Sequence, residues 1–196
     1  YSKNLKTKVN KKNIHKIVSE KEMKGYFGLL YKCYNNYKNT MPFKKAAKKL
    51  SLFSKKICEK RFKYLNSGMA IGIKNSKRTA YNWHQEAAYY KNIRNTLHYQ
   101  FPIIAPTSKR NGTMSVLSAS HKLGPIKKVK NIKFSKESIN TFLPKNIKKI
   151  QKKFKEKFIV MKLKDVCLFD ENIIHKTNKN IINQIRFVPI IRLQPS

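Results

Sequence analysis

Histidines and acidic residues are few enough in this chain that their spacing can be considered one by one. The 196 residues include five histidines and nine acids. His84 and Glu86 stand two apart in Trp83-His84-Gln85-Glu86, and alternate residues of a β-strand point to the same face. On a strand, this imidazole and carboxylate would supply two legs of the 2-His-1-carboxylate set that holds non-haem Fe(II). Such a pair also arises by chance, so the motif depends on its context.

Two further residues supply that context. His175 follows a strand-like run and a short turn, so it can lie on another strand of the same sheet. Eleven residues later, Arg186 stands inside the apolar run Ile185-Arg186-Phe187-Val188. An unpaired charge buried in such a strand is costly, so Arg186 requires an anionic partner. Because the chain has few acids, a bound dicarboxylate gripped by the guanidinium is a natural candidate.

The elements that must position these residues are short strands between turns. Their composition predicts strands at Met69–Ile73, Trp83–Tyr89, Leu97–Ala105, Thr113–Leu117, Phe158–Leu163, Val166–Phe169 and Ile185–Leu193. Pro102 indicates an edge position or a bulge in the third of these. Many short strands with helices grouped apart from them predict a small sandwich or jelly roll, mainly β with flanking helices.

Helical patterns occupy two basic regions. Residues 1–66 are predicted to form a basic, mostly helical segment that packs on the core, with two or three helices between residues 21 and 66. Residues 67–196 are the predicted β core, with a helical insert near 126–158. Within the insert, one face of a helix is expected to carry Ile147, Ile150, Phe154 and Phe158, which lie three or four residues apart.

The net charge of +36 raises the question of a polyanionic partner. Lysine supplies 39 of the 45 basic residues, whereas arginine, the residue favoured for phosphate and guanine recognition, supplies six. Lysine, asparagine and isoleucine, all with AT-rich codons, make up 79 residues. Coding bias therefore accounts for the charge better than a dedicated function, and nucleic acid is not the favoured partner. A non-enzymatic polyanion-binding module remains an alternative.

The remaining features concern compartment and the other histidines. Cys33, Cys58 and Cys167 form no CxxC pair, which favours reduced thiols in a cytoplasmic protein. No apolar run reaches the ~20 residues of a membrane span, and no secretory signal is visible, although a segment before Tyr1 could have been trimmed. His15 is expected at the surface, and His98 in the core or a pocket.

The ordered motifs resemble those of a known family, over about residues 68–193. The segments that carry the resemblance are Trp83-His84-Gln85-Glu86, Asn111-Gly112-Thr113-Met114, Ser118-Ala119-Ser120-His121-Lys122, Lys164-Asp165-Val166-Cys167-Leu168-Phe169-Asp170, His175 and Arg186. Together they are similar to those of the phytanoyl-CoA dioxygenase (PhyH)-like enzymes. The resemblance implies an Fe(II)- and 2-oxoglutarate-dependent oxygenase on a double-stranded β-helix, a cupin-like jelly roll.

Carried over by position, the resemblance implies a role for eight residues. His84, Glu86 and His175 would be the iron ligands and the catalytic centre. Arg186 would clamp the distal carboxylate of 2-oxoglutarate, with Thr177, Lys74 and Phe101 near the same cosubstrate. His121 would have a structural role in the Ser-His-Lys turn.

One ligand departs from the family pattern, because Glu86 stands where Asp is usual. A branch of the family that halogenates has a small residue there, so Glu86 favours oxygen insertion. The expected activity is hydroxylation of a small organic substrate by O2 with release of succinate and CO2, and an anion is one candidate for that substrate. A catalytically inactive jelly-roll ligand-binding protein is a further alternative, and nothing in the sequence indicates the substrate or the oligomeric state.

Overall fold

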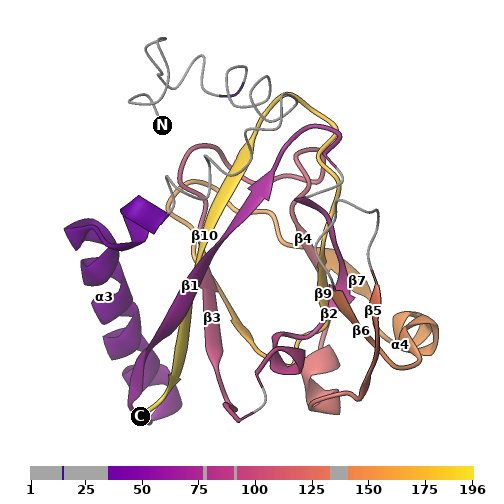
Figure 1. Ribbon diagram of the computed structural model, residues 1–196, viewed down its shortest axis with the longest axis horizontal. Helices are drawn as coiled ribbons and strands as arrows, with labels where there is room; N and C mark the ends of the chain where they lie inside the picture. Colours follow the sequence, from indigo (N-terminus) through magenta and orange to yellow (C-terminus); the bar gives the residue numbers. More distant parts are fainter. Residues whose placement is uncertain (1–14, 16–34, 77–78, 91, 133–140) are drawn as a thin grey trace.

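Two antiparallel sheets form the framework of the protein in a computed structural model that describes residues 15, 35–76, 79–90, 92–132 and 141–196 (Figure 1). The first sheet has the strand order β1-β10-β3-β8, and the second has the order β2-β9-β4-β7. The strands of the first sheet are β1 (Phe62–Gly72), β10 (Arg186–Pro195), β3 (Leu97–Gln100) and β8 (Cys167–Asp170). Those of the second are β2 (Tyr81–His84), β9 (His175–Thr177), β4 (Met114–Leu117) and β7 (Glu156–Phe158). This arrangement confirms the predicted double-stranded β-helix.

Helix α3 (Met41–Cys58) covers the outer face of the first sheet (Figure 1). Pro42 stands in its first turn, where the missing N–H costs nothing. The helix buries Phe43 and Ala47 against Ile191 and Leu193, which point outward from β10. Because residues alternate across a strand, Arg186, Ile190 and Arg192 of β10 face the other way, toward the second sheet.

The outer side of the second sheet is covered by a hairpin and a short helix. Strands β5 (Lys128–Ile132) and β6 (Thr141–Pro144) pair with each other, and α4 (Ile147–Lys153) follows them. Residues of this cover, including Ile147, Ile150 and Phe154, pack on Trp83, Leu117 and Ile174. Two 3-10 turns, η3 (Glu86–Ala88) and η4 (Ser120–Leu123), complete the described elements.

Several predicted boundaries change in the structure. The strand predicted from Leu97 ends at Gln100, and it is a central strand, so Pro102 ends β3 rather than marking an edge. The helix predicted to reach Phe158 ends at Lys153, and Phe158 belongs to β7, where it is 37% exposed. Residues 159–163 form no strand. The spacing of apolar residues predicts the helical region correctly up to Phe154. The residues that follow it form β7 instead, which pairs with β4 at the edge of the second sheet.

The N-terminal predictions can be compared with the structure only at residue 15 and from residue 35 onward. Helix α3 is one of the predicted N-terminal helices, whereas any helix between residues 21 and 34 lies outside the described residues, as do Cys33 and part of the predicted turn at 75–78. Strand β1 begins at Phe62, a few residues before the expected start of the core. His15 is half-buried rather than fully exposed, because its Nδ1 accepts a hydrogen bond from the Ile185 N–H. Within the described part of the chain, no helix is long and apolar enough to cross a bilayer.

Candidate metal and cosubstrate site

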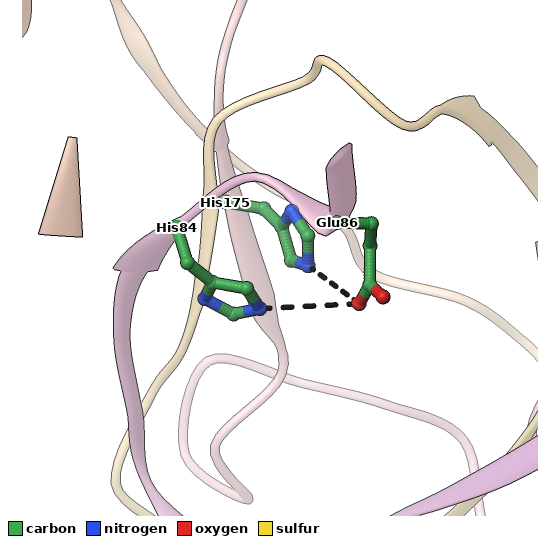
Figure 2. A group of neighbouring side chains, drawn as sticks. All are labelled: His84, Glu86 and His175. Carbon is green, nitrogen blue, oxygen red and sulfur yellow. Dashed lines mark ion pairs between the residues drawn. The ribbon is translucent and has the colours of Figure 1, made fainter. Parts of the chain in front are cut away.

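His84, Glu86 and His175 converge in the space between the two sheets (Figure 2). His84 ends β2, His175 begins β9, and the two residues are direct partners in the antiparallel pairing of these strands. The Oε1 atom of Glu86 lies 3.9 Å from His84 Nε2 and 3.7 Å from His175 Nε2. All three residues are buried. Two imidazoles and one carboxylate on one side of a cavity are the donor set of a facial metal triad.

The hydrogen bonds of both imidazoles leave the Nε2 atoms available as metal ligands. His84 Nδ1 lies 2.6 Å from the carbonyl oxygen of Asn82, and His175 Nδ1 lies 3.0 Å from that of Ile173. Because a carbonyl can only accept, Nδ1 carries the proton in each ring, and each Nε2 keeps its lone pair. This backbone support fixes the tautomer and the ring orientation, as metal-binding histidines require.

The path by which Glu86 reaches the histidines differs from the predicted one. The strand expected from Trp83 to Tyr89 ends at His84, and Glu86 begins η3. The shared-face argument was therefore wrong in its geometry, although the two side chains still meet. Gln85 explains the turn, because its buried amide donates to the carbonyls of Gly124 and Asn172 and accepts from the Ile126 N–H.

The charges around Glu86 keep its carboxylate ionised. Burial alone would raise the pKa of Glu86, but the Arg192 guanidinium, with Nε 3.3 Å from Oε2, together with His175 and His98 outweighs burial and holds that pKa well below its usual value. Burial, reinforced by repulsion from His175, lowers the pKa of His84 to about 3. A neutral imidazole beside a charged carboxylate is the protonation state that a divalent metal needs.

Arg186 lies in the same cavity, which has a volume of about 210 Å³. The side chain is 2% exposed, and its Nε and Nη2 atoms have no hydrogen-bond partner among the described residues. Burial lowers the pKa of Arg186 to about 10, so the group remains charged near neutrality. A buried guanidinium with two unused donors is costly unless an anion binds there, and a carboxylate accepts both donors at once.

The other three residues expected near the cosubstrate are placed differently. Thr177 of β9 lines the cavity with Arg186. Lys74 stands in the turn after β1, and Phe101 packs in the cluster beneath α3, so neither lines this cavity. Trp83 and Tyr99 are core residues, whereas Tyr89 is 39% exposed and packs edge-on against the His84 ring.

Sequence reasoning missed other residues of the site, chiefly Arg192, Gln100 and Tyr81. Arg192 could have been found, since it too stands in an apolar run and lies an even number of residues after Arg186, on the same face of one strand. Gln100 had no comparable signal. Glycines on β1 make room for both arginines. A Cβ on Gly72 would lie 3.0 Å from the Nε of Arg186, and a Cβ on Gly68 would lie 3.0 Å from the Nη1 of Arg192.

A buried chain of hydrogen bonds runs from Glu171 toward Glu86. The Thr96 hydroxyl lies 2.6 Å from Glu171 Oε2 and 2.9 Å from His98 Nε2. Since the hydroxyl gives its one proton to the carboxylate, it accepts from the Nε2–H of His98. Burial lowers the pKa of His98 to about 3, so its unprotonated Nδ1 faces Glu86 Oε2 at 4.0 Å. His98 thus lies beside the metal site, in line with the core or pocket position expected for it.

A jelly roll with a buried His-Glu-His group and an unsatisfied arginine between its sheets defines the class of Fe(II)/2-oxoglutarate oxygenase folds. The chain belongs to the phytanoyl-CoA dioxygenase (PhyH) family, whose model matches residues 11–188. Members of this family use Fe(II) and 2-oxoglutarate. No curated protein matches the chain in sequence.

Solved structures support the same fold. EvdO2 from Micromonospora carbonacea var. aurantiaca, complexed with 2-oxoglutarate, is 14% identical with a TM-score of 0.60, covering 84% of this chain and 64% of that one. EctD from S. alaskensis, with 2-oxoglutarate and 5-hydroxyectoine, is 18% identical with a TM-score of 0.55, covering 74% and 48%. The carbocyclase SnoK from nogalamycin biosynthesis is 10% identical with a TM-score of 0.55, covering 74% and 54%. The chain therefore spans about half to two thirds of these proteins.

The residues present fit both groups that the family uses. Two Nε2 lone pairs and an ionised carboxylate, held by backbone hydrogen bonds and Arg192, suit a divalent iron. The orphaned donors of Arg186 suit the distal carboxylate of 2-oxoglutarate.

Proposed function

We propose that this chain is an Fe(II)- and 2-oxoglutarate-dependent dioxygenase that hydroxylates a small organic substrate. The observation that carries the proposal is the buried, unsatisfied guanidinium of Arg186 in the same cavity as His84, Glu86 and His175. Glu86 faces both histidines, which favours an active site over an inactive jelly-roll relative. The cytoplasmic location remains a prediction.

The reaction balances with one oxygen molecule per turnover. An iron ion held by His84, Glu86 and His175 would supply the activation of O2: one oxygen atom would end in succinate as 2-oxoglutarate loses CO2, and the other would enter a substrate C–H bond as a hydroxyl group. Glu86 in place of a small residue favours this oxygen insertion over halogenation.

The chain's own residues hold and shield the reactants. His84, Glu86 and His175 would hold the metal. Arg186 would bind the distal carboxylate of 2-oxoglutarate bidentately, and the Thr177 hydroxyl would donate a hydrogen bond to it. Met114 and Ile190 supply apolar wall between these polar groups, which limits water in the cavity.

The test measures binding before turnover. Purified protein is titrated without oxygen with Fe(II) and then with 2-oxoglutarate, and succinate is measured after oxygen is admitted. We expect His175→Ala to weaken Fe(II) binding at least roughly 100-fold, since even residues behind metal ligands change affinity 10–100-fold. His121→Ala, an exposed histidine outside the cavity, is the matched control and should bind Fe(II) like the original protein. A chain that binds neither Fe(II) nor 2-oxoglutarate would contradict the proposal.

A further inference from the structure

A second cavity, of about 420 Å³, is lined by His84 and Glu86 but not by Arg186. Because 2-oxoglutarate would occupy the cavity of Arg186, the second cavity is the space beside the metal ligands that remains for a primary substrate. The side chains in its walls therefore line the space in which oxygen insertion would occur. Three of them carry electron-rich aromatic rings, namely Tyr81, Tyr89 and Tyr90.

Tyr89 contacts a metal ligand without lining the cosubstrate cavity. Its ring packs edge-on against the His84 ring, with 5.9 Å between the ring centroids, and the centroid of the Phe142 ring lies 5.0 Å away. The Phe142 N–H also donates a hydrogen bond of 3.4 Å to the Tyr89 hydroxyl. Burial raises the pKa of Tyr89 to about 12, so the phenol stays neutral. These contacts hold a neutral aromatic ring next to the metal-ligand group.

The other two tyrosines of this cavity are placed differently. Tyr81 also contacts the His84 ring, with 6.0 Å between the centroids, but it lines the cosubstrate cavity as well, which 2-oxoglutarate would fill. The Tyr90 hydroxyl accepts a hydrogen bond of 3.2 Å from a side-chain amide on β1, and among the described residues no ring contact joins Tyr90 to a metal ligand. Tyr89 is therefore the ring most open to oxidation from the metal site through the second cavity.

We infer that Tyr89 is a site of self-hydroxylation, oxidised by the protein's own metal site when O2 is consumed without a primary substrate. One oxygen atom of O2 enters a ring C–H bond beside the phenol oxygen, which gives a catechol side chain, and the other leaves in succinate as 2-oxoglutarate loses CO2. This inference rests on the proposed function, which supplies the iron, the 2-oxoglutarate and the O2. A substrate in the second cavity occupies the space beside Tyr89, so its own C–H bond reacts in place of the ring.

The test incubates the full chain with Fe(II), 2-oxoglutarate and isotopically labelled O2, and adds no other substrate. We expect peptide mass spectrometry to show one labelled oxygen atom on Tyr89, in a yield that depends on 2-oxoglutarate. Tyr64 is the matched control, because it is similarly exposed, at 47% against 39%, but packs beside Phe43 of α3 and lines neither cavity. It should gain no labelled oxygen. Tyr89→Leu should remove the modification, and Tyr64→Leu should leave the labelling of Tyr89 unchanged.

A second measurement tests the position of the ring without turnover. The tyrosines are replaced by fluorotyrosine, and paramagnetic Co(II) is added in place of Fe(II), with 2-oxoglutarate and without oxygen. The fluorine NMR signals of Tyr89 and Tyr64 are assigned by their absence in Tyr89→Leu and Tyr64→Leu. We expect bound Co(II) to broaden the Tyr89 signal more than the Tyr64 signal.

The outcomes separate this inference from the proposed function. Binding of Fe(II) and 2-oxoglutarate without labelled oxygen on Tyr89 overturns the inference alone. Equal labelling of Tyr64 also overturns it, because it would indicate an oxidant released into solution, and so does equal broadening of the two NMR signals by bound Co(II). Failure of the original protein to bind Fe(II) or 2-oxoglutarate overturns both.

Discussion

Both oxygens of Glu86 are held by Arg192, and only one of them faces the two histidines. Oε1 lies toward the Nε2 atoms of His84 and His175 and accepts a hydrogen bond of 3.5 Å from Arg192 Nη2, whereas Oε2 lies 3.3 Å from Arg192 Nε and faces His98. The guanidinium thus orients the carboxylate so that Oε1 is the oxygen available to a metal beside the histidines. Glu86 begins η3 directly after β2, and its carboxylate nevertheless lies beside both histidines.

The buried histidines predict how the stability of the metal-free protein depends on pH. His84 and His98 have pKa values of about 3 when folded, against 6.5 for an exposed histidine. The unfolded chain therefore binds more protons below pH 6.5. The free energy of unfolding should be fully retained above pH 6.5, and it should fall as the pH drops toward 3, by about 1.4 kcal/mol per pH unit per histidine. Urea unfolding at several pH values between 7.5 and 5 measures this slope.

A pair of variants separates the pH dependence caused by the buried histidines from a general loss of stability in acid. His98→Gln removes one of the two groups and should halve the slope below pH 6.5. His121→Gln removes an exposed histidine and should leave the slope unchanged. Equal slopes in the original protein and His98→Gln would contradict the assignment of His98 as buried and neutral.

The site residues that could be predicted from the sequence are those whose side-chain type itself indicates a role, such as a metal ligand or a buried cation. The ligand candidates followed from scarce histidines and acids, and Arg186 followed from a charge in an apolar strand. Positions that depend on chain geometry could not be predicted, because Gln85 turns the chain between His84 and Glu86 through contacts with loops far along the sequence. The Glu171–Thr96–His98 chain likewise joins residues that no local pattern connects.

Alternate side chains of β10 point to opposite faces of the first sheet, so this one strand contributes both to the cavity and to the core. Arg186 and Arg192 lie on the face between the sheets, and Ile191 and Leu193 lie on the face covered by α3. One strand thus contributes to the core and to anion binding, and β1 beside it supplies glycines where the arginines need room.

The glycines of β1 predict an effect on each arginine separately. In Gly72→Ala the new methyl would lie 3.0 Å from Arg186 Nε and 3.0 Å from the backbone oxygen of Asn111, so Arg186 must move. We expect the dissociation constant for 2-oxoglutarate to rise roughly tenfold, which corresponds to about 1.4 kcal/mol. A calorimetric titration of the Fe(II)-loaded protein measures this change.

Gly68→Ala is the matched control on the same strand. Its new methyl would lie 3.0 Å from the flexible end of Arg192, so it should change 2-oxoglutarate binding less than Gly72→Ala does. A larger effect from Gly68→Ala would contradict the assignment of Arg186 to the cosubstrate.

The helices and strands could be predicted where apolar residues recur at a regular spacing, whereas the residues at which they begin and end could be predicted less well. The last strand was predicted at Ile185–Leu193 and is found at Arg186–Pro195. Phe158 continued the helical spacing but pairs with Ser115 in a sheet, since strand pairing is a long-range interaction that periodicity does not reveal. Pro102 predicted an edge strand or a bulge, because a local rule cannot show that β3 has already ended at Gln100.

At the scale of the whole molecule, a net charge of +36 accompanies a cavity that contains the unsatisfied guanidinium of Arg186. Nine acids against 45 basic residues create a positive field around the protein, which increases the rate at which an anion arrives. Salt screens this field, since the Debye length shortens from roughly 10 Å at 0.1 M to roughly 3 Å at 1 M.

This field predicts a salt dependence that distinguishes charged from uncharged substrates. The kcat/KM for an acidic substrate should fall several-fold between about 0.05 and 0.5 M salt. The same measurement with an uncharged amide of that substrate should change little. An equal loss for both would indicate that salt acts on the enzyme itself rather than on the approach of an anion.

The central position of β10 also affects how the protein reaches its folded state. It is the last strand of the described elements, and it pairs with β1 on one side and β3 on the other. Such non-local pairing closes long loops and slows folding. Since both arginines arrive with this strand, a refolding chain should gain affinity for dicarboxylates only when the first sheet closes. The onset of 2-oxoglutarate binding during refolding would therefore report when the first sheet is complete. The ligand would also stabilise the folded state relative to partly folded states.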